Sequence, residues 1–190
     1  MERIYIEDET FDKADFAQTG LMKGEYDNCI FTGCNFSGVD LSDMSFSECE
    51  MTDCNMSMAK LMKTAFKDVR FKNCKLLGLR FDECSHFLFS VQFENCVLHL
   101  ASFYKSRLKK TRFINCNLKE ADFTEADLTG AVFENCDLTD AHFERTLLEK
   151  ADLRSAFNFS IDPGANEING AKFSMSGLPG LLGKYKIVIE

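Results

Sequence analysis

A large apolar residue recurs at every fifth position over most of this 190-residue chain. Counting in fives from Phe11 reaches Phe81 without meeting a polar residue, and a second count runs from Leu88 to Leu153. All 29 of these positions hold Phe, Tyr, Leu or Met. A period of five matches neither the ~3.6 residues of a helical turn nor the alternation of a strand, so the chain must turn steadily around an axis. The sequence therefore predicts a solenoid.

The number of sides follows from longer correlations. The residue two places before each apolar position is mostly Ala or Cys, which indicates a second, smaller inward side chain. Cys96, Cys116 and Cys136 recur at intervals of twenty, and Phe alternates with Leu at each step from Phe93 to Leu148. Twenty residues per coil means four five-residue sides with like side chains stacked in columns. About eight coils spaced by ~4.8 Å would make a narrow rod roughly 40 Å long.

Consecutive blocks between residues 121 and 145 read ADFTE, ADLTG, AVFEN, CDLTD and AHFER. They resemble the A(D/N)LXX motif of the pentapeptide-repeat family, and the resemblance extends over roughly residues 10–155. It implies a right-handed quadrilateral β-helix, an all-β solenoid whose four sides agree with those inferred from the spacing.

The carboxyl-terminal residues resemble the tail of quinolone-resistance pentapeptide proteins of the Qnr type. The matching segments are FSIDP at 159–163, AKFS at 171–174, GLPGLL at 177–182 and KIVIE at 186–190. The resemblance implies a cap of one short helix and one strand that joins two subunits tail to tail. A monomeric cap stays open as the alternative, because any solenoid must cover its last layer. The expected dimerisation residues are Leu178, Leu181, Leu182, Tyr185, Ile187, Val188 and Ile189.

We expect two parts, a repeat β-helix over residues 1–174 and a cap and dimerisation segment over residues 175–190. The register breaks near residues 82–92, where a seven-residue step separates Phe81 from Leu88. Two extra residues can bulge outward but are too few for a long arm.

The sequence offers no group of residues that predicts catalysis. The nine cysteines are separated by multiples of the repeat, except for Cys84, which sits at the register break, so we interpret them as small packing residues with free thiols rather than zinc ligands. The histidines are scattered, and no nucleophile elbow, phosphate-binding glycine loop or metal-binding helix motif occurs. A rod with a filled interior also lacks the concave apolar site that small ligands need. We therefore predict no enzyme activity, no metal and no cofactor.

Charge changes sign twice along the chain. Residues 1–59 contain 13 acids and 3 bases, residues 60–112 contain 4 acids and 12 bases, and residues 113–190 contain 13 acids and 7 bases. Imitation of duplex DNA is the mechanism that the resemblance implies, and carboxylates on the last segment could offer a sparser version of its charge to a basic groove. Solubility is the alternative reason for these acids. The candidate partner-binding residues are Glu120, Asp122, Glu125, Asp127, Glu134, Asp137, Asp140 and Glu144.

The basic middle segment argues against mimicry along the whole length. Its side chains could contact nucleic acid or an acidic partner, but the aromatic residues belong to the interior period and leave no stacking platform for single strands. We do not expect direct nucleic-acid binding.

The leading hypothesis is a binding protein rather than an enzyme. The amino-terminal residues show no secretory signal, and no apolar run of about 18 residues occurs, so we expect no membrane span and a cytoplasmic location. The resemblance implies a homodimer that engages a type II DNA topoisomerase (DNA gyrase or topoisomerase IV) by partial DNA mimicry and confers quinolone resistance. The alternative is an interaction or scaffold module with another partner, which the loop-free rod and the basic middle favour.

Overall fold

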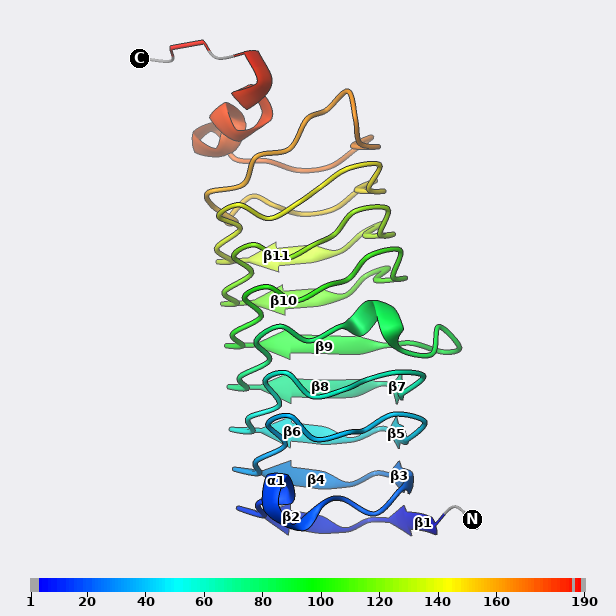
Figure 1. Cartoon of the computed structure of the whole chain (residues 1–190). Coiled ribbons are helices and arrows are strands. Elements are labelled where there is room, and N and C mark those ends of the chain that lie inside the picture. The colour runs from blue at the N-terminus through cyan, green and yellow to red at the C-terminus, as the bar shows by residue number, and fades with distance from the viewer. Residues whose placement is uncertain (1–3, 186, 189–190) are drawn as a thin grey trace.

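The chain winds into a parallel β-solenoid, shown in Figure 1 by a computed structural model that describes residues 4–185, 187 and 188. A first sheet has the order β1-β3-β5-β7, and a second sheet has the order β11-β10-β9-β8-β6-β4-β2. The seven strands of the second sheet mark about seven turns, close to the eight expected. The first sheet consists of β1 (Ile4–Glu7), β3 (Gly24–Asp27), β5 (Ser45–Ser47) and β7 (Ala65–Lys67). The second consists of β2 (Thr10–Asp12), β4 (Ile30–Thr32), β6 (Glu50–Thr52), β8 (Val69–Lys72), β9 (Val91–Glu94), β10 (Arg112–Ile114) and β11 (Val132–Glu134).

The strand register confirms a repeat of twenty residues per turn. Phe31 lies beside Phe11 and Met51, and isolated bridges continue the stacking as far as Lys172. Most five-residue sides end at a residue in the left-handed conformation, such as Asn28 at φ 49°. Asn, Asp and Gly tolerate this conformation better than other residues, which explains why they are frequent at these corners.

The interior is filled by columns of aromatic rings. Phe93, Phe113 and Phe133 stack with ring centroids 5.2 and 4.9 Å apart. A second column runs along the opposite side, where Phe103 stacks on Phe123 at 5.2 Å. Neighbouring columns meet edge to face, as Phe113 and Phe123 do at 5.9 Å, which is a favoured arrangement of aromatic pairs. The predicted alternation of inward Phe and Leu is therefore confirmed.

The nine cysteines are all buried and free, as predicted. Most of their thiols donate to backbone carbonyls of the preceding coil, for example from Cys54 to Phe31 over 3.4 Å and from Cys74 to Met51 over 3.1 Å. Burial raises the pKa of the Cys49 thiol to about 12, so this thiol stays protonated at neutral pH. These side chains fill the small inward position, which requires a residue of limited volume.

One corner of the rod carries an asparagine ladder that the sequence analysis did not identify. The amide of Asn95 donates to Asn73 over 3.1 Å, Asn115 donates to Asn95 over 3.0 Å, and Asn135 donates to Asn115 over 3.2 Å. Asn73 completes the series by donating to Asp53 over 3.0 Å. Asn73, Asn95 and Asn115 are each both donor and acceptor, and Asn135 donates at the end of the series, so hydrogen bonds outside the core join neighbouring coils.

The register break is a 22-residue coil. Val69 pairs with Val91, whereas other neighbouring strands pair at a distance of twenty residues. The two extra residues lie within residues 85–89, which we call the bulge, after the short 3₁₀ turn η1 (Phe81–Glu83). Leu88, which we counted as an inward residue, is 63% exposed and has a φ of 55°. That assignment was wrong because the inward series resumes only at Val91 and Phe93, once β9 has regained the ladder.

A short helix forms part of the first coil, and 3₁₀ segments cover the last coil. Helix α1 (Phe16–Thr19) lies in the first coil, and the 3₁₀ segments η2 (Met175–Leu181) and η3 (Gly183–Tyr185) lie over the last coil (Figure 1). Gly180 allows this approach, because a Cβ there would lie 2.4 Å from the carbonyl oxygen of Phe159. Ile187 and Val188 do not form the expected strand, because the chain after η3 runs away from the rod (Figure 1) and leaves these two side chains 55% and 86% exposed. Ile189 lies outside the described residues.

Candidate functional site

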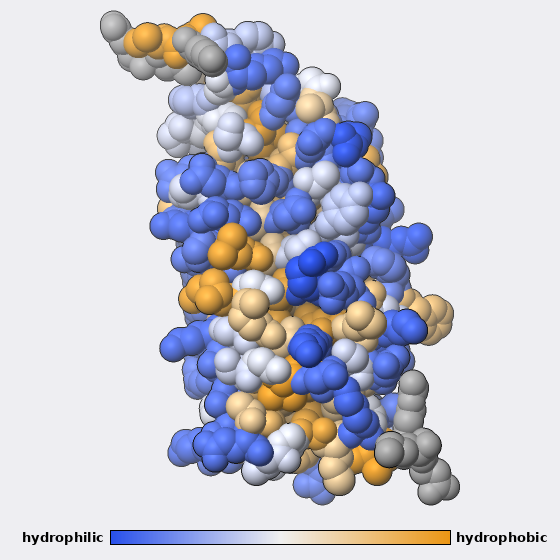
Figure 2. All heavy atoms as spheres, in the orientation of Figure 1, coloured by the Kyte–Doolittle hydropathy of each residue, from blue (hydrophilic) through white to orange (hydrophobic). Residues whose placement is uncertain are grey.

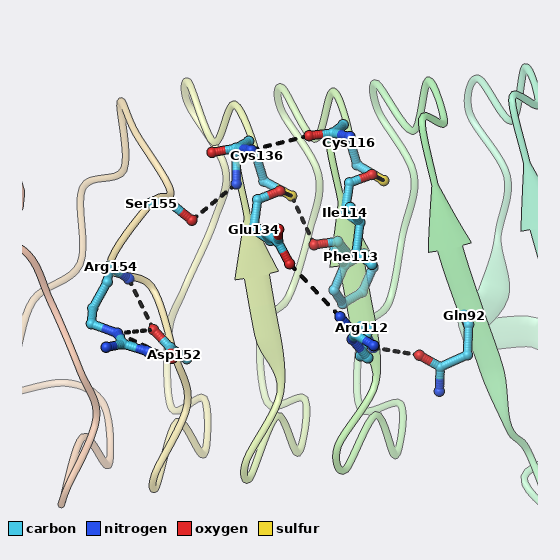
Figure 3. A network of polar contacts seen from close by, with 12 residues as sticks. Gln92, Arg112, Phe113, Ile114, Cys116, Glu134, Cys136, Asp152, Arg154 and Ser155 are labelled. Carbon is cyan, nitrogen blue, oxygen red and sulfur yellow. Dashed lines mark hydrogen bonds and ion pairs between the residues drawn. The ribbon is translucent and has the colours of Figure 1, made fainter.

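The described residues contain no concentrated site for catalysis or metal binding. No group of three or more His, Cys, Asp or Glu side chains among them could hold a metal ion. A shallow hollow of about 300 Å³ lies on the outer face of the second sheet, where Gln92 accepts a hydrogen bond from the backbone of Arg112 over 2.7 Å (Figure 3). Within the described part of the chain, no helix is long and apolar enough to cross a bilayer. The outer surface is therefore the candidate functional site.

Three of the predicted acidic residues hold turns of the backbone. One carboxylate oxygen of Asp122 accepts the backbone N–H of Thr124 over 2.9 Å, and Asp127 and Asp137 do the same for the threonines two residues on. This local pattern is the ordinary use of Asp and Asn in turns, since a short side chain reaches the N–H two residues later. The second position of the repeat therefore has a structural reason to be Asp or Asn.

Basic side chains neutralise most of the predicted acidic surface. Glu125 lies 2.9 Å from Arg145 and 3.3 Å from Lys105, and Asp127 lies 3.2 Å from Lys109. Partial burial opposes ionisation of Asp127, but hydrogen bonds from Thr129 and the ion pair with Lys109 outweigh it and lower the pKa. The remaining pairs are Glu134 with Arg112, Asp137 with Lys119 and Glu144 with Arg145.

The other three predicted acids have no Lys or Arg partner among the described residues. Glu120 lies 3.0 Å from the imidazole of His99, whereas Asp122 and Asp140 form no ion pair within that part of the chain. Glu120 and Asp140 are corner residues on adjacent coils, both in the left-handed conformation, so their carboxylates project from one edge of the rod. The acidic surface is thus narrower than the sequence indicated.

The predicted dimerisation residues divide into inward and outward groups. Leu181 packs against the core and covers the last coil, so it has a role within one chain. Leu178, Tyr185, Ile187 and Val188 are exposed, and Leu182 is partly buried. An apolar surface therefore remains at this end of the rod and is available for a contact with another molecule.

The basic segment, by contrast, holds several cations without an acidic partner. Five of its side chains form ion pairs, among them Lys105 with Glu125 and Arg80 with Asp82. The bases with no ion pair to any residue that the structure describes are Lys60, Lys63, Lys67, Arg70, Lys75, Arg107 and Lys110. Figure 2 shows the face seen in Figure 1 covered mostly by hydrophilic side chains, with apolar groups between them. The uncompensated positive charge thus lies in the middle of the rod.

The bulge stands within this basic segment and exposes two large apolar side chains. Phe87 is 71% exposed, and a hollow beside it is lined by His86, Leu88, Lys105 and Arg107. In Figure 1 the bulge projects on the side of the rod that carries the first sheet. Sequence reasoning located the break but placed Leu88 inside, because the spacing of apolar residues does not distinguish a core residue from the tip of a turn.

Comparison with known proteins identifies the repeat and the fold. The family model described as the pentapeptide repeat region matches residues 19–86 and 85–156. No curated protein matches the chain in sequence.

Solved structures share the fold at low sequence identity. The full-length structure of QnrB1, described as a plasmid-mediated fluoroquinolone resistance protein, superposes with a TM-score of 0.63 at 17% identity over 97% of this chain and 100% of that one. A trypsin-treated variant of QnrB1 has a TM-score of 0.55 at 20% identity, over 98% of this chain and 92% of that one. HetL from the cyanobacterium Nostoc sp. strain PCC 7120, described as involved in heterocyst differentiation regulation, has a TM-score of 0.57 at 17% identity, over 92% and 86%. At these identities the likeness establishes the fold and leaves the role open.

Proposed function

Because this chain belongs to the pentapeptide-repeat family, we propose that it is a non-enzymatic binding protein that acts by docking its outer surface on another protein. The observation that carries this proposal is the filled interior: rings and thiols occupy the inside of the rod along its length, and the chemistry available to a partner is on the outside. Proteins of this family are generally non-enzymatic.

We propose a type II DNA topoisomerase, DNA gyrase or topoisomerase IV, as the partner to test first. The support is a likeness to QnrB1 over nearly the whole chain, together with the carboxylates of the acidic segment. A basic groove that binds DNA would meet Glu120, Asp122 and Asp140 directly. It could also displace Lys105 and Arg145 from Glu125, because an ion pair formed by exposed side chains stabilises a protein by only about 0–1 kcal/mol. Mimicry of DNA would therefore be partial, confined to this part of the rod.

The test is gyrase supercoiling in the presence of ciprofloxacin, with the chain titrated from substoichiometric amounts to excess. The proposal predicts rescue of supercoiling at low ratios. The informative variant is the triple substitution Asp122→Asn, Asp127→Asn and Asp137→Asn. Asn already accepts the same turn hydrogen bond at equivalent positions, as Asn117 does from Lys119 over 3.1 Å, so the fold is retained while three charges are removed. Rescue should fall in this variant and persist in Asp40→Asn, a matched change in the first part of the rod, where Asp40 likewise accepts the backbone N–H of Ser42 over 2.9 Å.

A second candidate function rests on the pairing of the acids. Five of the eight predicted acidic residues already have Lys or Arg partners, while the basic segment and the bulge remain uncompensated. This distribution favours an interaction module that recognises an acidic partner, and HetL offers a precedent for the same fold in a regulatory role. Absence of both rescue and inhibition with gyrase and with topoisomerase IV would support this candidate over the first.

A further inference from the structure

The charge of the side chains on the outer face of the first sheet changes from negative to positive along the rod. One outward column consists of Glu7, Asp27, Ser47 and Lys67, which are in register on β1, β3, β5 and β7. Two acids are thus followed by a small neutral residue and then by a base. Asp27 and Lys67 form no ion pair with described residues, although Asp27 accepts a hydrogen bond from Tyr5 over 2.9 Å.

The centre of this face is flat. The outward side chains of β5 are Ser45 and Ser47, and β7 adds Ala65, so no long side chain stands in the middle. On the coil after β7 the bulge projects from the same side of the rod (Figure 1), and Arg107 follows on the next coil, where it pairs in the ladder with Asp127. The acidic and basic halves of the face therefore lie on either side of a smooth strip.

We propose that this face binds the same face of a second copy of the chain, with the two rods antiparallel and a two-fold axis running along β5. A two-fold interface requires a self-complementary surface, and a sign change about a neutral centre provides one. Rotation about β5 places β3 of one copy opposite β7 of the other and keeps positions along the strands aligned. Asp27 then meets the second copy's Lys67, and this contact occurs twice.

The bulge supports the same axis. β5 is two coils from β1 on one side and two coils from the bulge on the other, so Phe87 and Leu88 of one copy fall opposite the first strand of its partner. There an exposed Tyr5 borders an open hollow lined also by Ile6 and Phe11. Because β1 is the last strand of its sheet, a projecting bulge can pack at this end, whereas it would hold two faces apart if it met the middle of the rod.

The size of the face sets the expected affinity. Five coils spaced by ~4.8 Å and strands of about five residues give a face of roughly 24 by 17 Å, or about 400 Å² before the bulge is counted. Stable interfaces bury about 800 Å² on each partner, so this dimer should be weak and concentration-dependent. Its charge pairs should make it weaken as salt rises.

Sedimentation velocity over a wide concentration range, at about 50 mM and about 500 mM salt, tests the proposal. Asp27→Lys places lysines opposite Lys67, and Lys67→Glu places acids opposite Asp27, so each single variant should dissociate at least tenfold more readily. The double variant Asp27→Lys with Lys67→Glu restores opposite charges and should dimerise as the wild-type chain does. Arg70→Glu, the same charge change on the second sheet of the same coil, is the matched control and should have no effect.

A cross-link tests the axis itself. Across the two-fold axis, Ser47 of one chain lies opposite Ser47 of the second copy. Ser47→Cys should therefore form an intermolecular disulfide under mild oxidation, while the native thiols stay buried. Thr52→Cys on the outer face of β6 should not. A wild-type chain that is monomeric at low salt, or a dimer that survives both single variants, would overturn the proposal. A dimer that is lost only on Leu178→Glu and Tyr185→Glu would also overturn it, in favour of a contact through the cap.

Discussion

The substitution Phe123→Ala tests the packing of the core most severely. The ring of Phe123 is fully buried and lies at the centre of four others. It stacks on Phe103 at 5.2 Å and on Phe143 at 5.1 Å, and it meets Phe113 and Phe133 edge to face at 5.9 and 5.8 Å. Alanine would remove the ring and all four contacts, and the regular coils on either side leave the cavity little freedom to collapse.

The expected loss of unfolding free energy is at the upper end of the usual range. Phe→Ala in a core costs about 3–5 kcal/mol, and each aromatic pair adds about 0.5–1.5 kcal/mol beyond area burial. We therefore expect about 5 kcal/mol, measured by urea denaturation followed by circular dichroism. For a chain of this size the midpoint of thermal unfolding should fall by roughly 10–20 °C.

The matched control is Phe143→Ala. Phe143 is 8% exposed, and Phe123 is the one aromatic ring in contact with it among the described residues. The loss of unfolding free energy should therefore be about 3 kcal/mol. Equal losses in the two variants, or a change below about 1 kcal/mol for Phe123→Ala, would refute the ring-column description of the core.

Three further changes probe the corners, the small inward position and the turns. Asn95→Ala should cost about 2–3 kcal/mol, since it removes two ladder hydrogen bonds and leaves Ala in a left-handed conformation; Asn95→Gly loses the same bonds without that strain and should cost about 1 kcal/mol less. Ser106→Ala should raise the unfolding free energy by about 1 kcal/mol, seen as a higher urea midpoint, because the buried hydroxyl has no hydrogen-bond partner among the described residues. A loss of stability would contradict this. Hydrogen bonds from Ser42, aided by Lys23, lower the pKa of Asp40 from 3.8 to about 2. The contribution of this carboxylate to the unfolding free energy is therefore complete above pH ~4 and is lost as the pH falls from about 4 to about 2. In Asp40→Asn the unfolding free energy should fall less over this pH range than in the wild-type chain.

The sequence was sufficient to predict the fold because one constraint acts on every coil. Phe113 and Leu118 occupy successive sides, and any polar residue there would be buried without a partner, so the pattern persists through the whole rod. A constraint on volume acts in the same way two places before each large apolar residue, where a side chain such as Cys116 must be small enough to fit beside the rings. Twenty-residue spacing then determines the register.

The surface could be predicted only in part. Asp127 and Lys109 are eighteen residues apart, and whether they pair depends on side-chain directions on two adjacent coils, which a count of charges along the chain does not contain. The asparagine ladder does have a sequence signal, since Asn73, Asn95, Asn115 and Asn135 recur at the coil length with the two-residue shift of the bulge. Leu88 was misplaced because its apolar character suits a core as well as an exposed turn.

Direct binding to DNA gyrase, measured by biolayer interferometry with duplex DNA as competitor, tests the proposed function most directly. The account predicts saturable binding that duplex DNA displaces and that the Asp122, Asp127 and Asp137 to Asn triple variant weakens. Absence of binding to gyrase and to topoisomerase IV, or binding that neither DNA nor the triple variant changes, would contradict it.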